Sequence, residues 1–290
     1  MAPHRSIPNL VILLGLLLTA CSTKPHADPV VFPDLGMPLP TLMPSPTGMA
    51  PIAATATPLS QDGAWQTAAA GIELRRMRVA VGNIQAPLSL VRIDPSQVRF
   101  VVGYQPYTPP TLGQWAAQHN ALVVINGGFF DANGHSVSLL VQAGEAIGSS
   151  YVERGGMFAV TPSGAVLLRA LSDTPYDPAE PLAEALQGWP LLVRPGGTPA
   201  YDYEDGQRAR RSVIALDRSG RVLLIASASS AFTLAELSHW LANSDLELDA
   251  AVNLDGGAST GLLLRSPNAP ERIEPFVALP IVLMVLPKDS

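Results

Sequence analysis

Residues 250–260, with the sequence AAVNLDGGAST, join a short apolar run to a carboxylate and two glycines. An apolar run of this length, bounded by turn residues, is typical of a buried strand. Asp255 follows the run, and a carboxylate in such a place needs a partner or a function. Gly256 and Gly257 permit positive φ angles and a close approach of the backbone to a ligand. The segment therefore predicts a strand that ends in a ligand-binding loop.

An earlier segment, LVVINGGFFD at residues 122–131, has the same pattern. Each segment closes a unit of strand, helix and strand, which spans 98–126 in the first case and 221–255 in the second. In this register Asn126 corresponds to Asp255. We expect an internal strand-helix-strand repeat whose two Gly-Gly loops line one cleft, because ligands bind beyond the carboxyl ends of strands in open α/β sheets. The alternative is two ordinary strand ends that are alike by chance.

The helices of both units begin with a capping box, Thr-x-x-Gln at 111–114 and Thr-x-x-Glu at 233–236. The rest of the chain from about residue 70 consists of short apolar runs separated by turns, which predict strands. We also expect a short helix over 181–186 and a buried terminal strand over 277–286. The predicted fold is a single α+β domain over 70–290, with mixed, largely antiparallel sheets and a few packed helices.

Composition excludes several classes of protein. The 290 residues include 18 Lys and Arg against 24 Asp and Glu, a net charge of −6, which argues against binding to nucleic acid. Apolar residues make up 47% of the chain, enough for a sizeable core. The single cysteine excludes a disulfide framework and a cysteine-based zinc cluster. The five histidines lack the spacing of zinc ligands.

The N-terminal residues predict a signal peptide and a lipid anchor. Residues 1–20 have the basic start and the short apolar run of a signal peptide. Cys21 follows Leu-Thr-Ala and resembles the lipidated cysteine of a bacterial lipobox; the alternative is ordinary signal cleavage beside an incidental cysteine. Residues 21–69 are rich in proline and predict an extended tether. We expect a lipoprotein of the bacterial cell envelope, and Ser22 favours the outer membrane. The predicted partners are therefore the membrane, through the lipid, and a glycan.

The polar residues of the two loops point to chemistry on a sugar phosphate. Asp131 and Asp255 are two carboxylates, as cleavage of an acetal requires, and Arg211 opens an apolar strand and can bind a phosphate. Asp131 could instead be a turn residue before Asn-Gly, and Arg211 lies in an arginine cluster of the kind usually solvated. The other candidate ligands of sugar or phosphate are Asn126, Gly127, Gly128, Asn253, Gly256, Gly257, Ser259 and Thr260. Of these, Asn126, Asn253 and Ser259 would either hold sugar hydroxyls or orient the carboxylates. The oxygen atoms of Asp131, Asp255 and Asn253 would also suit calcium, but the spacing of an EF-hand is absent, and we predict no metal and no cofactor.

Three segments resemble motifs of the phosphodiester glycosidase family. Residues 126–130 have the family sequence Asn-Gly-Gly-Phe-Phe. Residues 211–215 correspond to the family motif Arg-Thr-Ala-Ile-Gly, and residues 253–259 correspond to the family motif Asn-Leu-Asp-Gly-Gly-Gly-Ser. Ala215 and Ala258 replace glycines of the family pattern, and an alanine at a positive φ would be strained.

The resemblance implies an enzyme that hydrolyses a glycosyl-1-phosphodiester. It further implies that Asp255 and Asp131 serve as acid and as base or nucleophile, and that Arg211 binds the phosphodiester. The alternative is a noncatalytic glycan-binding lipoprotein that has the same cleft.

Overall fold

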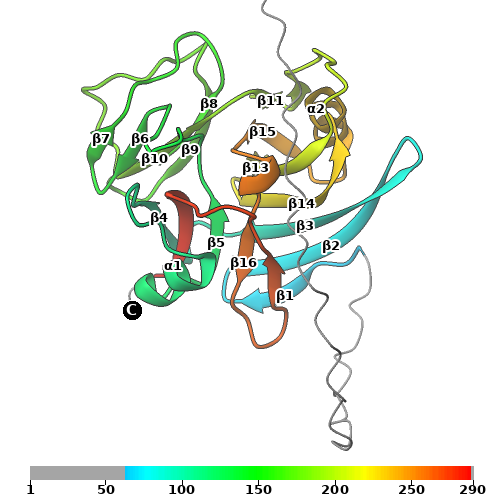
Figure 1. The fold of residues 1–290 in the computed structure, drawn as a ribbon, viewed down its shortest axis with the longest axis horizontal. Helices are drawn as coiled ribbons and strands as arrows, with labels where there is room; N and C mark the ends of the chain where they lie inside the picture. Colours follow the sequence, from blue (N-terminus) through cyan, green and yellow to red (C-terminus); the bar gives the residue numbers. More distant parts are fainter. Residues whose placement is uncertain (1–62, 289–290) are drawn as a thin grey trace, which may run out of the picture. The chain divides into compact units, whose positions relative to one another are not determined.

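The computed structural model describes residues 63–288 (Figure 1). The predicted signal peptide, Cys21 and most of the predicted tether lie outside the described residues. β1 (Gln66–Ala69) falls within the range predicted as tether and pairs with β2 (Ile72–Val81), so the first sheet starts before residue 70. Within the described range, no helix has the length and apolar content that a membrane crossing requires.

Three sheets make up the described part of the chain. The first has eight strands, in the order β1, β2, β3 (Ile84–Ile93), β14 (Val222–Phe232), β13 (Ala209–Asp217), β15 (Leu248–Asn253), β11 (Leu191–Arg194) and β12 (Thr198–Pro199). The second has five, in the order β7 (Glu145–Ile147), β6 (Leu140–Gln142), β10 (Glu184–Gly188), β8 (Gly156–Val160) and β9 (Val166–Ala170). The third also has five, in the order β17 (Glu271–Ile273), β16 (Leu262–Leu264), β5 (Val123–Asn126), β18 (Ile281–Pro287) and β4 (Val98–Tyr104).

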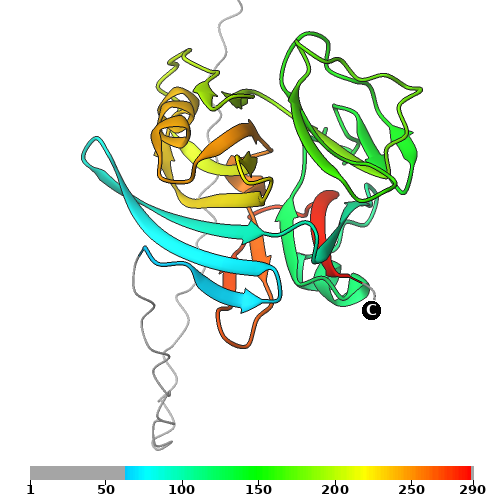
Figure 2. The ribbon, with the colours of Figure 1, turned by 180° about the vertical axis from the view of Figure 1, so that it is seen from behind.

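All strand pairs in these sheets are antiparallel, which confirms the predicted largely antiparallel α+β fold. The terminal strand predicted over 277–286 forms as β18, inside the third sheet. Figure 2 shows the second sheet and the long β2–β3 hairpin at opposite sides of the folded unit.

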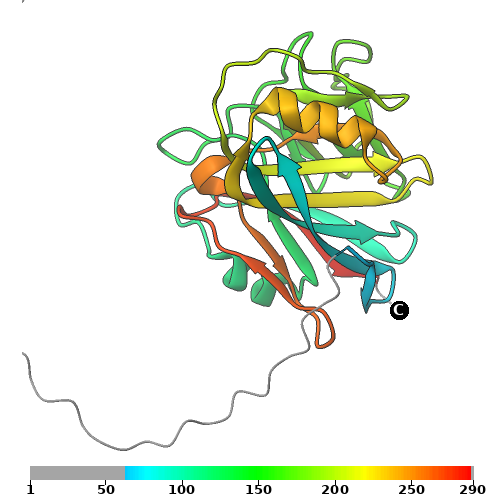
Figure 3. The same cartoon turned by 90° about the vertical axis from the view of Figure 1, so that its right-hand side faces the viewer.

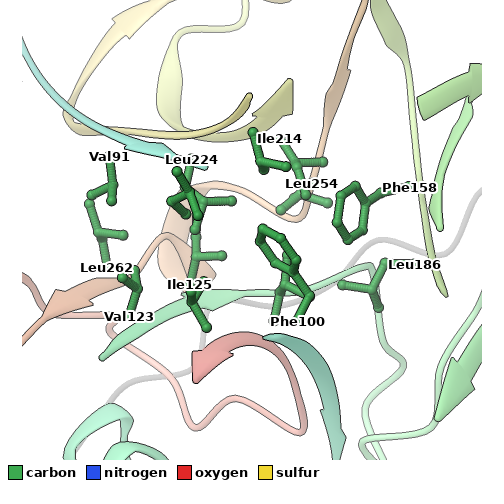
Figure 4. Packing of buried hydrophobic residues seen from close by; sticks show 14 of the residues in the cluster. Val91, Phe100, Val123, Ile125, Phe158, Leu186, Ile214, Leu224, Leu254 and Leu262 are labelled. Atoms are coloured by element: carbon green, nitrogen blue, oxygen red, sulfur yellow. The ribbon is translucent and has the colours of Figure 1, made fainter. Parts of the chain in front are cut away.

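The main core lies where one face of each sheet meets the others. Phe100 and Ile125 come from the third sheet, Phe158 from the second, and Ile214 and Leu224 from the first (Figure 4). All five side chains are buried. Burial of each contributes about 1.5–3 kcal/mol to folding, so the packing of the three sheets fixes the loops at their edges.

The two helices cover outer faces of the sheets. α1 (Leu112–His119) begins after Thr111 and packs on the third sheet, while α2 (Leu234–Asn243) begins after Thr233 and packs on the first sheet (Figure 3). In both, the threonine hydroxyl accepts from the third helical N–H, and the side chain of that third residue accepts in return from the threonine N–H. The two predicted capping boxes are confirmed.

The helix predicted over 181–186 is wrong, because Glu184–Gly188 is strand β10 in the middle of the second sheet. All five residues of β10 are buried, whereas a surface helix would keep a solvated face. The Glu184 carboxylate accepts from the Val102 N–H at 2.9 Å and from the Ala143 N–H at 3.3 Å. Packing and these bonds outweigh the helix propensity of Leu, Ala and Glu.

The two predicted strand-helix-strand units have the same local topology. One consists of β4, α1 and β5, and the other of β14, α2 and β15. In each unit the two strands are antiparallel to one strand between them, β18 or β13, and therefore run parallel to each other. The units lie in different sheets, and an internal repeat is not established by this likeness.

Candidate functional site

The two glycine loops meet, as the sequence predicts. The Asp255 N–H donates to the Gly127 carbonyl at 3.1 Å, and the Asn126 side-chain amide donates to the Asp255 carbonyl at 2.6 Å. One loop follows β5 of the third sheet and the other follows β15 of the first sheet. The site is therefore built where two sheets join.

Asn126 holds this junction together. Its side chain is 1% exposed, and its Oδ1 accepts from the Ser212 hydroxyl at 2.7 Å and from the Gly261 N–H at 3.1 Å. Its Nδ2 donates to the carbonyl of Asp255. Because both ends of the amide are bonded to protein, Asn126 positions the loops; of the two roles predicted for it, orienting a carboxylate fits these bonds better than holding a sugar hydroxyl.

The loop glycines are needed mainly for close packing. Only Gly257 of the four has a positive φ, +59°. A Cβ at Gly128 would come within 2.9 Å of a backbone carbonyl oxygen, and one at Gly256 within 2.8 Å. A Cβ at Gly127 would overlap the Ile281 side chain. The expectation of positive φ in both loops is thus wrong for three of the four positions.

The two alanines that replace family glycines are not strained. Neither Ala215 nor Ala258 has a positive φ. Ala215 is buried in β13, and Ala258 is exposed in the short 3-10 helix η1 (Gly257–Ser259). The backbone of the loop therefore accommodates alanine at both positions.

A pair of substitutions in η1 tests whether residue 257 needs a positive φ and residue 258 does not. Gly257→Ala should lower the free energy of unfolding by about 1–2 kcal/mol, because an added Cβ meets no atom within 4 Å and only the left-handed φ is penalised. Ala258→Gly, the matched variant, should change it by less than about 1 kcal/mol. Urea denaturation of both variants provides the measurement. A larger loss for Ala258→Gly than for Gly257→Ala would contradict the assignment.

Asp255 has the electrostatics of a functional carboxyl. Burial raises its pKa, because desolvation disfavours the charged form, and hydrogen bonding by the Ser259 side chain and the Gly256 N–H opposes that rise. The Gly256 N–H lies 2.9 Å from Oδ1. A carboxyl with a raised pKa in a loop between sheets is a candidate for proton transfer.

The other predicted ligands of this loop are buried. Ser259, Thr260 and Asn253 are all at most 6% exposed. The Asn253 Nδ2 donates to the Trp189 carbonyl at 2.9 Å. Within residues 63–288, the Asn253 Oδ1 and the Thr260 hydroxyl have no hydrogen-bond partner. Buried oxygens without partners are costly, and at a functional loop they leave bonds free for water or a ligand.

The Arg211 backbone lies beside the loop of Asp255, with its Cα 4.0 Å from where a Cβ at Gly256 would be, but its side chain is bonded to carbonyl groups outside that loop. Its Nε donates to the Phe232 carbonyl at 3.2 Å and its Nη2 to the Gln207 carbonyl at 2.7 Å. Burial lowers its pKa, and the neighbouring Asp205 and Tyr201 oppose that shift. These contacts place the guanidinium beside the 201–208 segment.

Asp131 belongs to a turn. Its Oδ1 accepts from the N–H groups of Asn133 at 2.8 Å and His135 at 2.9 Å. The bond from the His135 N–H is the main cause that lowers its pKa. Its carboxylate is exposed, and its hydrogen bonds all lie within residues 131–135, so the second carboxylate predicted for the site serves a turn before Asn-Gly.

Tyr151 is a residue of the site that the sequence analysis missed. Burial raises its pKa, and the negative charge of Asp255 raises it further, while a hydrogen bond with Ser138 and the charge of Arg154 act in the opposite direction. Its N–H donates to the buried Gln187 side chain at 2.9 Å. The phenol thus lies in the electrostatic neighbourhood of Asp255.

Tyr151 also lines a cavity of about 450 Å³, within the size range of ligand pockets. The lining includes Ser149, Ser150 and Arg154, whose guanidinium carbon lies 5.2 Å from the centre of the Tyr151 ring. No motif marks this segment in the sequence. Its location follows from Gln187 of β10, which anchors it through Ser150 and Tyr151.

No group of three or more His, Cys, Asp or Glu side chains suited to a metal ion occurs among the described residues. Asp131 and Asp255, which were considered for calcium, do not belong to such a group.

Comparison with known proteins identifies relatives of this chain. The model of the phosphodiester glycosidase family matches residues 119–285, which include all three motifs. None of the curated proteins matches the sequence.

The fold is similar to that of solved structures. The catalytic domain of zebrafish N-acetylglucosamine-1-phosphodiester alpha-N-acetylglucosaminidase, auto-inhibited by its pro-peptide, aligns with a TM-score of 0.61 at 16% identity. The alignment covers 79% of this chain and 87% of that domain. A protein from Burkholderia pseudomallei K96243 aligns with a TM-score of 0.50 at 13% identity, over 70% of this chain and 74% of that one. At these identities the likeness establishes a shared fold.

Proposed function

The chain belongs to the phosphodiester glycosidase family, and from this we propose that it hydrolyses a glycosyl-1-phosphodiester in a glycan or glycoconjugate. The observation that carries the proposal is the partly buried Asp255, whose pKa is raised and whose loop is tied to Asn126 and Gly127. The products would be the free sugar and a phosphomonoester.

Asp255 acts in this reaction as the base. It takes a proton from water, the water oxygen forms a bond to the anomeric carbon, and the bond from that carbon to the phosphate oxygen breaks with its electron pair on the phosphate. An alcohol leaving group would need a second carboxyl to protonate it. A phosphomonoester has a second pKa of about 6, so it leaves without a donated proton. One carboxyl therefore suffices, in keeping with the turn role of Asp131.

The cavity beside Tyr151 is the place for the phosphodiester. Arg154 lines this cavity with its guanidinium, and Ser149 and Ser150 add hydroxyl groups. Arginine suits a phosphate because its planar fork of donors can bind two oxygens. Arg211, which was predicted to bind the phosphodiester, already has its Nε and Nη2 bonded to carbonyl groups.

Arg154→Ala should raise KM for a glycosyl phosphodiester about tenfold or more and leave kcat within a few-fold, since the phosphate is charged in both the ground and the transition state. Arg194→Ala is the matched control, because Arg194 is also exposed but pairs with Asp173. Steady-state kinetics of both variants measures the effect. An unchanged KM for Arg154→Ala would remove Arg154 from the phosphate site.

Turnover itself tests the proposal against a noncatalytic glycan-binding protein. The protein is incubated with methyl phosphodiesters of N-acetylglucosamine 1-phosphate and of glucose 1-phosphate. Phosphorus NMR then follows the conversion of phosphodiester to phosphomonoester. Turnover of either compound supports the hydrolase, and binding of a glycan without turnover of any phosphodiester supports the alternative.

We further propose that Cys21 anchors the protein to the bacterial envelope through lipid, because the only cysteine of the chain follows Leu-Thr-Ala at the end of the predicted signal peptide. Cys21→Ala should release the protein from the membrane fraction or leave it as uncleaved precursor. Thr23→Ala should fractionate as the wild type does. Normal processing and full membrane retention of Cys21→Ala would contradict the lipid anchor.

A further inference from the structure

Three aromatic side chains form a continuous group at the surface. The ring centres of Trp189 and Tyr201 are 5.9 Å apart, and those of Tyr201 and Tyr203 are 6.5 Å apart, both pairs nearly perpendicular at 83°. Tyr203 is 68% exposed and Trp189 38% exposed. We call Trp189, Tyr201 and Tyr203 the aromatic platform. Exposed aromatic groups of this kind are typical of binding surfaces, because such rings offer contact area at a small cost in side-chain entropy.

The aromatic platform begins next to the loop of Asp255. The carbonyl of Trp189 accepts from the Asn253 side chain, and the Asn253 N–H donates to the Pro190 carbonyl at 3.0 Å. Asn253 precedes Asp255 by two residues, a distance of at most about 7 Å along the backbone. The end of the platform at Trp189 is therefore joined to the strand end that leads into the loop of Asp255.

The segment that carries two of the rings is fixed in place. The Tyr201 N–H donates to the Ser238 hydroxyl of α2 at 3.1 Å. The Glu204 carboxylate accepts from the Thr233 hydroxyl at 2.6 Å and from the Gly206 N–H at 2.7 Å. These bonds tie the segment to the start and the middle of α2, so the rings are held in their arrangement before any ligand arrives, which lowers the cost of binding.

Charged side chains lie near the ring of Tyr201. Arg211, whose Nε and Nη2 donate to the carbonyls of Phe232 and Gln207, is near both Asp205 and Tyr201. The Asp205 carboxylate belongs to an exposed residue, and carboxylates can accept hydrogen bonds from sugar hydroxyls. The C–H face of a pyranose is apolar and slightly positive, so it is attracted to the negative face of an aromatic ring. Aromatic faces with such polar neighbours suit a pyranose better than an apolar peptide, which would leave these groups without partners.

We propose that the aromatic platform is a saccharide-binding subsite that takes a neutral pyranose unit. The bond between Trp189 and Asn253, two residues before Asp255, assigns to the platform the sugar or glycan chain joined to the far side of the phosphodiester. That the bound sugar is part of the substrate rests on the proposed hydrolase function. The binding of the sugar to the platform does not depend on that function.

Isothermal titration with three trisaccharides, N-acetylchitotriose, maltotriose and mannotriose, tests the subsite. At least one should bind the wild type, and Tyr203→Ala should weaken that binding about three- to tenfold, the loss of one stacking ring. Tyr203→Phe keeps the ring and should bind as the wild type. Tyr107→Ala is the matched control, since Tyr107 is 81% exposed and packs on His135 instead.

A fluorescence titration assigns the contact to the platform. The wild type should change its tryptophan emission on sugar binding, and Trp189→Phe should abolish most of that change while the other three tryptophans remain. The proposal is overturned if none of the trisaccharides binds, if Tyr203→Ala binds like the wild type, or if Tyr107→Ala weakens binding equally.

Methyl phosphodiesters carry no sugar on the far side of the phosphate, so their hydrolysis tests the proposed function without the platform. Sugar binding without hydrolysis would remove the hydrolase and keep the saccharide subsite. Hydrolysis that is unaffected by Tyr203→Ala for a substrate with a hexose on the far side would keep the hydrolase and remove the subsite.

Discussion

Asp255→Asn is expected to lower kcat for a glycosyl phosphodiester by about 10²–10⁴-fold and to change KM little. The reason is that the amide keeps the shape of the side chain but cannot take a proton from water. In the wild type, kcat should rise as the pH rises through the pKa of Asp255, which burial raises above its ordinary value. Steady-state kinetics over a pH series measures both effects.

Stability provides the control for this variant. Because the folded pKa of Asp255 is raised, its contribution to stability is complete below the unfolded pKa of about 3.9 and is lost as the pH rises through the folded value. Asp255→Asn cannot ionise, so at pH 7 it should melt at a temperature at least as high as the wild type. Near pH 4 this advantage should vanish. If Asp255→Asn is inactive but has a melting temperature at least as high as that of the wild type, it has lost the catalytic step and kept the fold.

Asp131→Asn separates one-carboxylate from two-carboxylate mechanisms. The asparagine oxygen can still accept from the Asn133 and His135 N–H groups, so the turn should remain. Activity close to that of the wild type is expected. A loss as large as that of Asp255→Asn would mean that Asp131 takes part in catalysis, and near wild-type activity of Asp255→Asn would make Asp255 structural.

Asn126→Ala is expected to lower the free energy of unfolding by at least about 3 kcal/mol. The substitution leaves three buried groups without their partner: the Ser212 hydroxyl, the Gly261 N–H and the Asp255 carbonyl. Each such group costs about 1–3 kcal/mol. Since these bonds join β5, β13 and the second loop, activity should fall together with stability. Urea denaturation followed by circular dichroism gives the measurement.

Two further variants keep this prediction testable if Asn126→Ala fails to fold. Ser212→Ala removes one of the bonds and should cost about 1–2 kcal/mol. Asn243→Ala removes an exposed bond to the His239 carbonyl in α2 and should cost less than about 0.5 kcal/mol. Equal losses for Asn126→Ala and Asn243→Ala would show that the junction between the sheets does not depend on Asn126.

The sequence was informative where a feature depends on nearby residues or on a pattern that two segments share. The capping boxes at Thr111 and Thr233 form as predicted, because each involves four consecutive residues. The meeting of the loops at Asn126 and Asp255 was also predicted, because polar residues followed by Gly-Gly end two buried strands. Such motifs can be identified from the sequence without knowledge of how the strands pair.

The sequence was uninformative where a feature depends on which face of a strand a residue occupies. Ser212 points to Asn126, and the next residue back along β13, Arg211, is bonded to Phe232 and Gln207 on a different side. Tyr151 comes near Asp255 only because β10, mistaken for a helix, anchors its segment. Such contacts are set by the pairing of distant strands, which a single sequence does not specify.

The position of β18 has a consequence for folding during synthesis. β18 follows every other strand in the chain, yet it lies between β4 and β5 in the third sheet. The sheet that carries Asn126 therefore stays open on the ribosome until residue 287 has been synthesised, and loop closure over so many residues slows folding. A chain released without residues 281–287 would leave β4 without its strand partner and one edge of β5 unpaired.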